Sequence, residues 1–178
     1  MLENQPDIEK PLVDADKCWY ALYTKSRHEK KTAELLVEKE ITTFLPIIKT
    51  LRQWSDRKKY VQVPLFNSYI FIEINYKDRQ RVLETDGVVC FVRTGNQPSV
   101  VPVNEINAMK AYVNQASEKN INYEIEAGHT VRIIRGPMKG LLGEVTKVNG
   151  AQKIRIKIEA INQFLNLTVP ASLVEPVR

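Results

Sequence analysis

Residues 131–145 read VRIIRGPMKGLLGEV, which places three glycines within eight positions between two β-rich runs. The glycines are Gly136, Gly140 and Gly143. Glycines packed this closely are typical of a turn that needs a positive φ angle or a close approach between two backbones. The stretch therefore predicts a tight turn between strands. A purely structural role and a contact role are equally compatible with that turn.

The sequence on both sides of this turn is typical of short strands. In residues 153–158, Ile154, Ile156 and Ile158 face one way, and the basic side chains between them face the other. Several short strands in about fifty residues, separated by glycine-bearing turns, predict a small β-barrel. The expected strands cover residues 130–134, 144–148, 153–158 and 165–169.

The chain before residue 114 alternates strands with helices. Ser26 and Glu29 have the spacing of a capping box at the start of the first helix, and Asn104 is expected to cap the last one. Cys90 lies among apolar residues and is expected to be a small buried side chain in a buried strand. The expected strands are 18–23, 43–45, 47–54, 60–63, 68–74 and 88–92, and the expected helices are 26–40, 77–84 and one beginning at 104.

This order of elements predicts an α+β fold, in which helices pack on a mostly antiparallel sheet. Four segments are expected: an acidic flexible leader at 1–17, an α/β sandwich at 18–113, a polar linker at 114–125 and the small barrel at 126–178. The leader holds five acidic and two basic side chains, a net charge of −3, so the other residues carry +8. A basic body favours encounter with a polyanion such as a nucleic acid.

The sequence contains no motif that supports catalysis or metal binding. Its two histidines, His28 and His129, fall in different predicted segments, and it has no Cys-x-x-Cys, His-Glu-x-x-His, Walker or Gly-x-Gly-x-x-Gly sequence. We therefore expect no enzyme, no metal and no cofactor. The chain has no apolar run long enough to span a membrane and no secretory signal at its start, and Cys18 and Cys90 fit a reducing compartment. A cytoplasmic protein is expected.

Two groups of residues resemble a known family. Residues 131–145 resemble the KOW motif, including its hallmark glycine at Gly143, and the stretches 19–23, 64–72 and 87–93 resemble the three signature strands of the NusG N-terminal domain. The resemblance covers residues 18 to 176. The sequence is more similar to the specialised RfaH group and to the UpxY-type antiterminators of capsular polysaccharide operons than to housekeeping NusG. Where the family has Phe-Phe-Pro-Gly-Tyr, residues 65–69 read LFNSY.

The resemblance implies a NusG-like α/β sandwich followed by an SH3-like barrel, and a transcription elongation or antitermination factor that suppresses pausing and termination. It implies that the first part binds the coiled-coil clamp helices of the largest RNA polymerase subunit through an apolar hollow. The hydroxyl groups of Tyr23 and Tyr69 favour a surface position, whereas Phe71 and Phe91 fit the core equally well. The matching positions are Tyr23, Leu65, Phe66, Tyr69, Phe71 and Phe91.

The resemblance also implies contact with the non-template DNA strand by a basic cluster at the first helix. That cluster comprises Lys25, Arg27, His28 and Lys31, and the hairpin tip 57–59 is a second candidate for contact with the DNA backbone. The barrel, expected to be folded as a barrel at rest, is implied to recruit a ribosomal protein or the Rho factor. We expect a monomer. A ribosomal or other RNA-binding protein with a KOW barrel remains the alternative.

Overall fold

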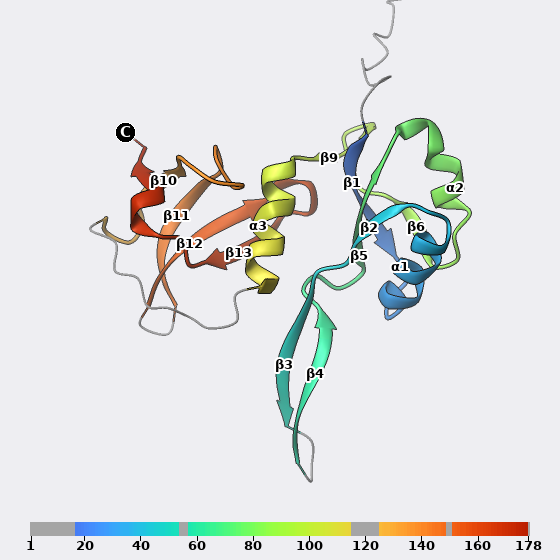
Figure 1. Cartoon of the computed structure of the whole chain (residues 1–178), viewed down its shortest axis with the longest axis horizontal. Helices are drawn as coiled ribbons and strands as arrows, with labels where there is room; N and C mark the ends of the chain where they lie inside the picture. The colour runs from blue at the N-terminus through green and yellow to red at the C-terminus, as the bar shows by residue number, and fades with distance from the viewer. Residues whose placement is uncertain (1–16, 54–56, 115–124, 149–150, 178) are drawn as a thin grey trace, which may run out of the picture.

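The computed structural model describes residues 17–53, 57–114, 125–148 and 151–177. Two five-stranded antiparallel sheets organise this part of the chain, and helix α3 (Val103–Asn114) lies between them (Figure 1). The α+β class and the small C-terminal barrel predicted from the sequence are confirmed. Most of the expected acidic leader and of the expected linker lies outside the described residues.

The first sheet is built around its central strand. Strand β1 pairs antiparallel with β5 from Cys18 opposite Ile74 to Tyr23 opposite Tyr69. It also pairs with β6 and, at its start, with β9. The sheet order is β2–β5–β1–β6. The strands are β1 (Cys18–Thr24), β2 (Thr42–Phe44), β5 (Tyr69–Ile74), β6 (Val88–Phe91) and β9 (Val100–Val101).

Helices cover both faces of this sheet. Leu36 of α1 (Glu29–Glu38) and Val82 of α2 (Arg79–Leu83) are buried in one apolar cluster with alternate residues of β1 and β5. The short 3-10 helix η1 (Tyr76–Asp78) precedes α2. On the opposite face, α3 packs against the remaining alternate residues. The Nζ atom of Lys110 there lies 5.4 Å from the centroid of the Trp19 ring.

The predicted capping box at the first helix is wrong. His28 occupies the N-cap position of α1, and the structure shows no hydrogen bond from its side chain to the helix. The backbone turns sharply at Arg27, which has a φ angle of 63°. This turn separates Ser26 from the first helical residue. Glu29 is buried, and its Oε1 atom accepts a hydrogen bond of 2.8 Å from the backbone amide of Ser68. Glu29 therefore holds the turn before β5 instead of capping α1.

The predicted buried strand at 88–92 is half exposed. Val89 and Cys90 are exposed, whereas the Phe91 ring is buried opposite Leu22. The reason is that β6 ends the order of strands in its sheet. Cys90 is therefore not the buried thiol that its apolar neighbours indicate.

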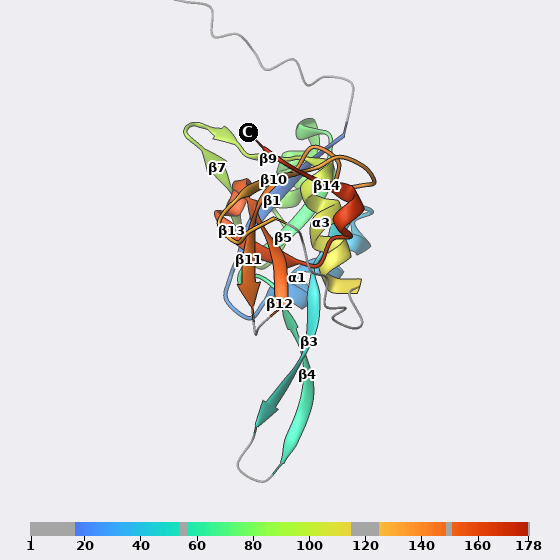
Figure 2. The same ribbon diagram turned by 90° about the vertical axis from the view of Figure 1, so that its left-hand side faces the viewer.

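Strands β3 (Ile47–Gln53) and β4 (Lys58–Pro64) form a two-stranded ribbon that projects from the body (Figure 2). Within the described residues, neither strand pairs with a third strand. A smaller ribbon follows β6 and consists of β7 (Arg93–Thr94) and β8 (Gln97–Pro98).

The second sheet closes around a core of branched apolar side chains that includes Ile133, Val145 and Ile154. Its order is β13–β12–β11–β10–β14, and all four strands predicted in this region are present. The elements are β10 (Thr130–Ile133), β11 (Leu142–Val148), β12 (Ala151–Ile158), η2 (Glu159–Ile161), β13 (Gln163–Leu167), η3 (Ala171–Leu173) and β14 (Val174–Pro176).

The three glycines of the turn meet two different needs. Gly136 and Gly140 have φ angles of 83° and 91°, which residues with a side chain rarely adopt. Gly143 is required by space, because a Cβ atom there would overlap the side chain of Ile154 and lie 3.0 Å from the Arg155 carbonyl oxygen.

Helix α3 contacts the barrel through this same turn. The Nδ2 atom of Asn107 donates to the Pro137 carbonyl at 2.9 Å, and that of Asn104 donates to the Lys139 carbonyl at 3.3 Å. The helix begins at Val103, so Asn104 lies in its first turn. The prediction that Asn104 is the residue before the helix is therefore wrong. Its side-chain oxygen accepts a hydrogen bond of 3.0 Å from the Glu105 backbone amide, and its side-chain nitrogen joins the helix to the turn.

Glu105 of α3 is a buried carboxyl group at this junction. Burial raises its pKa from the ordinary 4.5 to about 7, and the charge of Glu159 in η2 adds to the shift. Its Oε2 atom has no hydrogen-bond partner among the described residues. The folded protein therefore resists ionisation of Glu105 more strongly than the unfolded chain does.

We expect the Gly143→Ala substitution to lower the free energy of unfolding by about 1–3 kcal/mol, because the new methyl group overlaps Ile154. Thermal unfolding followed by circular dichroism measures the effect. Leu142→Ala at the neighbouring exposed position is the control and should change stability by less than about 0.5 kcal/mol. Equal stability of the Gly143→Ala and wild-type proteins would show that β11 and β12 are not this close.

We also expect Glu105→Gln to flatten the dependence of stability on pH. The raised pKa means that the wild-type protein loses stability as the pH rises from 4.5 to about 7, where Glu105 ionises only on unfolding. Urea unfolding measures the free energy of unfolding at pH 5 and at pH 7.5. The difference between these two values should be smaller in the variant than in the wild-type protein, by on the order of 2 kcal/mol. Glu34→Gln on the exposed face of α1 is the matched control. An unchanged pH dependence in Glu105→Gln would contradict the burial argument.

Candidate functional site

A hollow of about 370 Å³ opens at the edge of the first sheet, where the end of β1 meets β6. Tyr23 and Tyr69 lie opposite each other on β1 and β5, and their rings contact edge to face with centroids 5.6 Å apart. Tyr23 keeps 43% of its surface exposed. Tyr23, Tyr69, Cys90, Phe91, Val92 and Arg93 line the hollow. It therefore presents an aromatic wall to the solvent.

Phe91 borders the hollow with its ring turned away. The ring lies 5.8 Å from Tyr20 and 5.9 Å from Tyr76 by centroid distance, on the face of the sheet covered by α1 and α2. Only 5% of Phe91 is exposed. Of the two roles that the sequence left open for Phe91, the described structure places it in the core.

Three further predicted contact residues pack in one apolar cluster. Phe66 and Phe71 are buried with ring centroids 6.4 Å apart, and Leu65 is half-buried against the same cluster. That cluster continues through Met109 of α3 into the core of the barrel. The structure therefore divides the six predicted positions: Tyr23 and Tyr69 form the hollow, and the other four have mainly packing contacts.

Sequence reasoning missed Cys90, Val92 and Arg93 as lining residues. Cys90 lies opposite Tyr23 in the pairing of β1 with β6, so both side chains face the same side. Alternation along β6 was the available signal, because the ring of Phe91 and the side chain of Cys90 must then face opposite ways.

The predicted basic cluster divides into two groups. Lys25 and Lys31 both contact Asp86, with Nζ–carboxylate distances of 3.2 and 3.7 Å. The hydrogen bond from Lys25, followed by its charge, holds the pKa of Asp86 below its ordinary value. All three side chains are more than half exposed, so solvent screens these pairs. Asp86, which the sequence analysis did not single out, partly neutralises the cluster.

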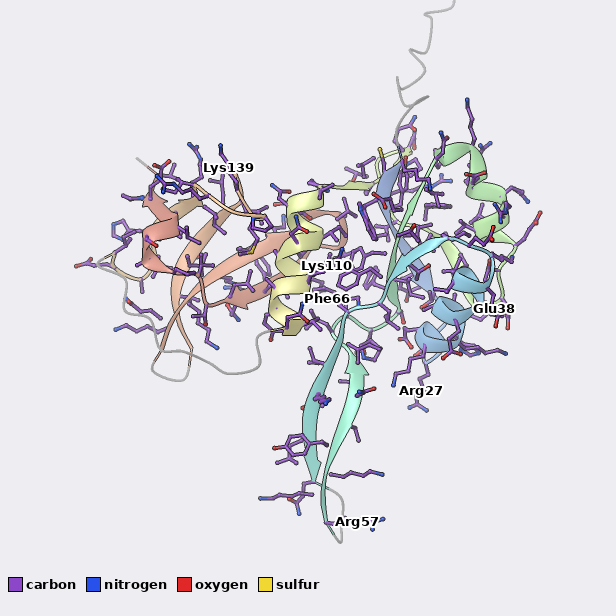
Figure 3. The ribbon with its side chains drawn as sticks, viewed as in Figure 1. Arg27, Glu38, Arg57, Phe66, Lys110 and Lys139 are labelled. Carbon is purple, nitrogen blue, oxygen red and sulfur yellow. The ribbon has the colours of Figure 1, made fainter. Side chains whose placement is uncertain are left out.

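Arg27 and His28 form the second group and have different neighbours from Lys25 and Lys31 (Figure 3 labels Arg27). Arg27 and Lys30 line a polar hollow of about 460 Å³ between the start of α1 and the end of β4. The Nδ1 atom of His28 lies 3.0 Å from the Ser26 carbonyl oxygen. Lys25, Lys31 and Arg27 are thus exposed on one end of the first sheet, whereas His28 is half-buried.

The described residues contain no group of three or more His, Cys, Asp or Glu side chains that could hold a metal ion. Within the same described ranges, no helix is both long enough and apolar enough to cross a membrane.

An α+β sandwich with an aromatic hollow, followed by an SH3-like barrel with a KOW turn, defines a two-part class of protein. Residues 17–110 match the family model described as transcription termination factor nusG, and residues 127–157 match the KOW motif. The chain belongs to the NusG family, whose members are transcription termination and antitermination factors.

Curated relatives align with most of the chain. The NusG protein of Lactococcus lactis is 23% identical over 180 residues, covering 94% of this chain and 97% of its own. NusG of Thermus thermophilus is 26% identical over 165 residues, covering 79% and 89%. A solved structure titled "Domain interaction in Thermotoga maritima NusG" shares the fold with a TM-score of 0.56 and 22% identity, covering 91% of this chain and 98% of that one.

Proposed function

We propose that this chain is a cytoplasmic transcription elongation and antitermination factor, without enzymatic activity, that binds RNA polymerase through the hollow beside Tyr23 and Tyr69. The observation that carries the proposal is an aromatic pair at the edge of an otherwise well-packed sheet, in which Tyr23 is exposed and Tyr69 is half-buried. The family membership supports it, because members act in transcription termination and antitermination.

The hollow suits a pair of protruding helices, the clamp helices of the largest polymerase subunit. Apolar side chains on a helix surface insert into grooves of this kind, and buried aromatic residues dominate the energy of such contacts. Tyr23 is about half exposed, so covering it would contribute about 1 kcal/mol from area alone, and its hydroxyl can keep a polar partner at the rim. The exposed thiol of Cys90 and the side chain of Arg93 add contacts at the same edge.

Binding of this kind acts by selection among polymerase states. A factor that binds the closed clamp more tightly than the open clamp shifts the population toward the closed form. The protein then needs only a difference in affinity to suppress pausing and termination. The absence of a catalytic constellation from the sequence is consistent with such a role.

A second surface for DNA is part of the proposal. Lys25, Lys31 and Arg27 lie at one end of the first sheet and can contact the phosphates of the exposed non-template strand. Asp86 opposes this contact, because it lies within 3.7 Å of both lysine Nζ atoms and repels a phosphate. DNA must therefore compete with Asp86 for both lysines.

We further propose that residues 18–113 and 126–178 act as two functional modules joined by a linker at 114–125, with the acidic segment 1–17 as a leader. The first module would bind polymerase, and the second would recruit a ribosomal protein or Rho. A monomer that acts on capsular polysaccharide operons, like the RfaH and UpxY-type factors that the sequence resembles, fits this arrangement.

We expect Tyr69→Ala and Tyr23→Ala each to weaken binding to polymerase by about fivefold or more, because each removes one ring of the aromatic wall. A pull-down with the purified clamp-helix segment measures the loss, and transcription through a terminator measures its consequence. Phe164→Ala, which removes a half-exposed ring from the barrel, is the matched control and should bind normally. Undiminished binding by both tyrosine variants would refute the docking proposal.

We expect Asp86→Asn to strengthen binding to a non-template oligonucleotide severalfold at low salt, because it frees Lys25 and Lys31 from a competing charge. The gain should fade as the ionic strength rises. Gel shifts over a range of salt concentrations provide the measurement. Asp78→Asn makes the same change in charge at an exposed position of η1 and should have a smaller effect. Equal gains in the two variants would argue against a local contact at Lys25.

A further inference from the structure

The β3–β4 ribbon is attached to the body only at its root, among the residues that the structure describes. The Leu65 amide donates to the Pro46 carbonyl at 2.8 Å and closes the base of the ribbon. The Nζ atom of Lys30 donates to the Gln62 carbonyl at 3.1 Å and ties the ribbon to α1. From that root both strands extend away from the sheets, with Arg57 near the far end (Figures 2 and 3).

Basic side chains cover the ribbon. Residues 47–64 contain five basic side chains and a single acidic one, Asp56. Lys49, Lys58 and Lys59 are exposed. Because neighbouring residues of a strand point to opposite faces, Lys58 and Lys59 place a positive charge on each face of the ribbon. The net charge of this segment is therefore +4, compared with +5 for the whole chain.

One face also carries an exposed apolar pair. Leu51 and Tyr60 lie opposite each other and are 49% and 70% exposed. The register places the pairs Lys49–Gln62 and Gln53–Lys58 on the same face, on either side of them. This face therefore combines ammonium, amide and apolar groups, the three kinds of group that contact phosphates, base edges and thymine methyls.

We propose that the β3–β4 ribbon binds duplex DNA, with the Leu51–Tyr60 face directed into the major groove. A two-stranded ribbon fits a groove about 12 Å wide. Its strands of seven residues, at about 3.3 Å per residue, extend about 23 Å, which is most of a helical turn of DNA. The lysines on both faces can then reach the phosphates that border the groove.

The chemistry of the described ribbon favours a duplex over a single strand. Proteins that hold single strands stack successive bases on several aromatic side chains. Residues 47–64 contain two aromatic residues, Trp54 and Tyr60, and of these only Tyr60 lies in the described ribbon, beside the aliphatic Leu51. On the described part of the Leu51–Tyr60 face, Tyr60 supplies the one aromatic ring, which does not make a stacking platform, whereas an apolar pair flanked by amides suits the floor of a groove.

The ribbon also continues the basic end of the first sheet. The polar hollow lined by Arg27 and Lys30 includes Val63 and Pro64 from the last residues of β4. A duplex lying along the ribbon would therefore end beside Arg27. This interaction is separate from the hollow at Tyr23 and does not depend on polymerase, so it can be tested with the isolated full-length protein.

The test uses fluorescence anisotropy with a labelled 20-base-pair duplex and with one of its strands alone, over a series of salt concentrations. The wild-type protein should bind the duplex more tightly than the single strand. We expect the double variant Lys49→Glu/Lys58→Glu to bind the duplex at least tenfold more weakly. The slope of log K against log salt should fall in size by about two, because two phosphate contacts are lost.

The control is Lys139→Glu/Lys147→Glu, which makes the same change in net charge at exposed positions of the barrel. It should bind the duplex within about threefold of the wild-type protein. Equal losses in the two double variants would overturn the proposal, since the effect would then be one of total charge. Tighter binding to the single strand, or no binding by the wild-type protein, would also overturn it. Retained polymerase binding by the ribbon variant would show that the two surfaces act independently.

Discussion

The pairing of β1 with β5 is the interaction on which the rest of the structure depends. Its register places Tyr20 and Leu22 on one face, against α1 and α2, and Trp19 and Ala21 on the other, against α3. An apolar strand that must bury both faces requires cover on both sides. The same register ends with Tyr23 opposite Tyr69, where the cover stops, and so leaves Tyr23 exposed beside the half-buried Tyr69.

Helix α3 is the second constraint, because it belongs to two cores at once. Met109 packs in a cluster that runs from the face of the first sheet to the barrel, and Asn107 bonds the turn at Pro137. This position buries Phe66 and Phe71 and leaves the hollow at the far edge open. The protein thus keeps a small aromatic hollow open, while Phe66 and Phe71 pack in the cluster that joins its two parts.

The sequence predicted the fold where the signal was local. Alternation at Ile154, Ile156 and Ile158 identified a barrel strand, and the spacing of Gly136, Gly140 and Gly143 identified the turn. It failed where the outcome depends on distant residues. The exposure of Cys90 follows from the position of β6 at the edge of its sheet. The side chain of Glu29 in α1 accepts a hydrogen bond from the amide of Ser68, which is 39 residues away in the sequence. The predicted sites were divided for the same reason, since no local pattern shows that Phe66 faces α3 or that Asp86 reaches Lys25.

The central claim is that the hollow beside Tyr23 and Tyr69 receives the clamp helices of RNA polymerase. The most direct measurement is an NMR titration of the labelled full-length protein with a peptide pair that forms those helices. The account predicts the largest shifts in the signals of Tyr23, Tyr69, Cys90 and Arg93, with the core signal of Ile72 little changed. Shifts confined to the barrel, with those four residues unaffected at saturation, would contradict it.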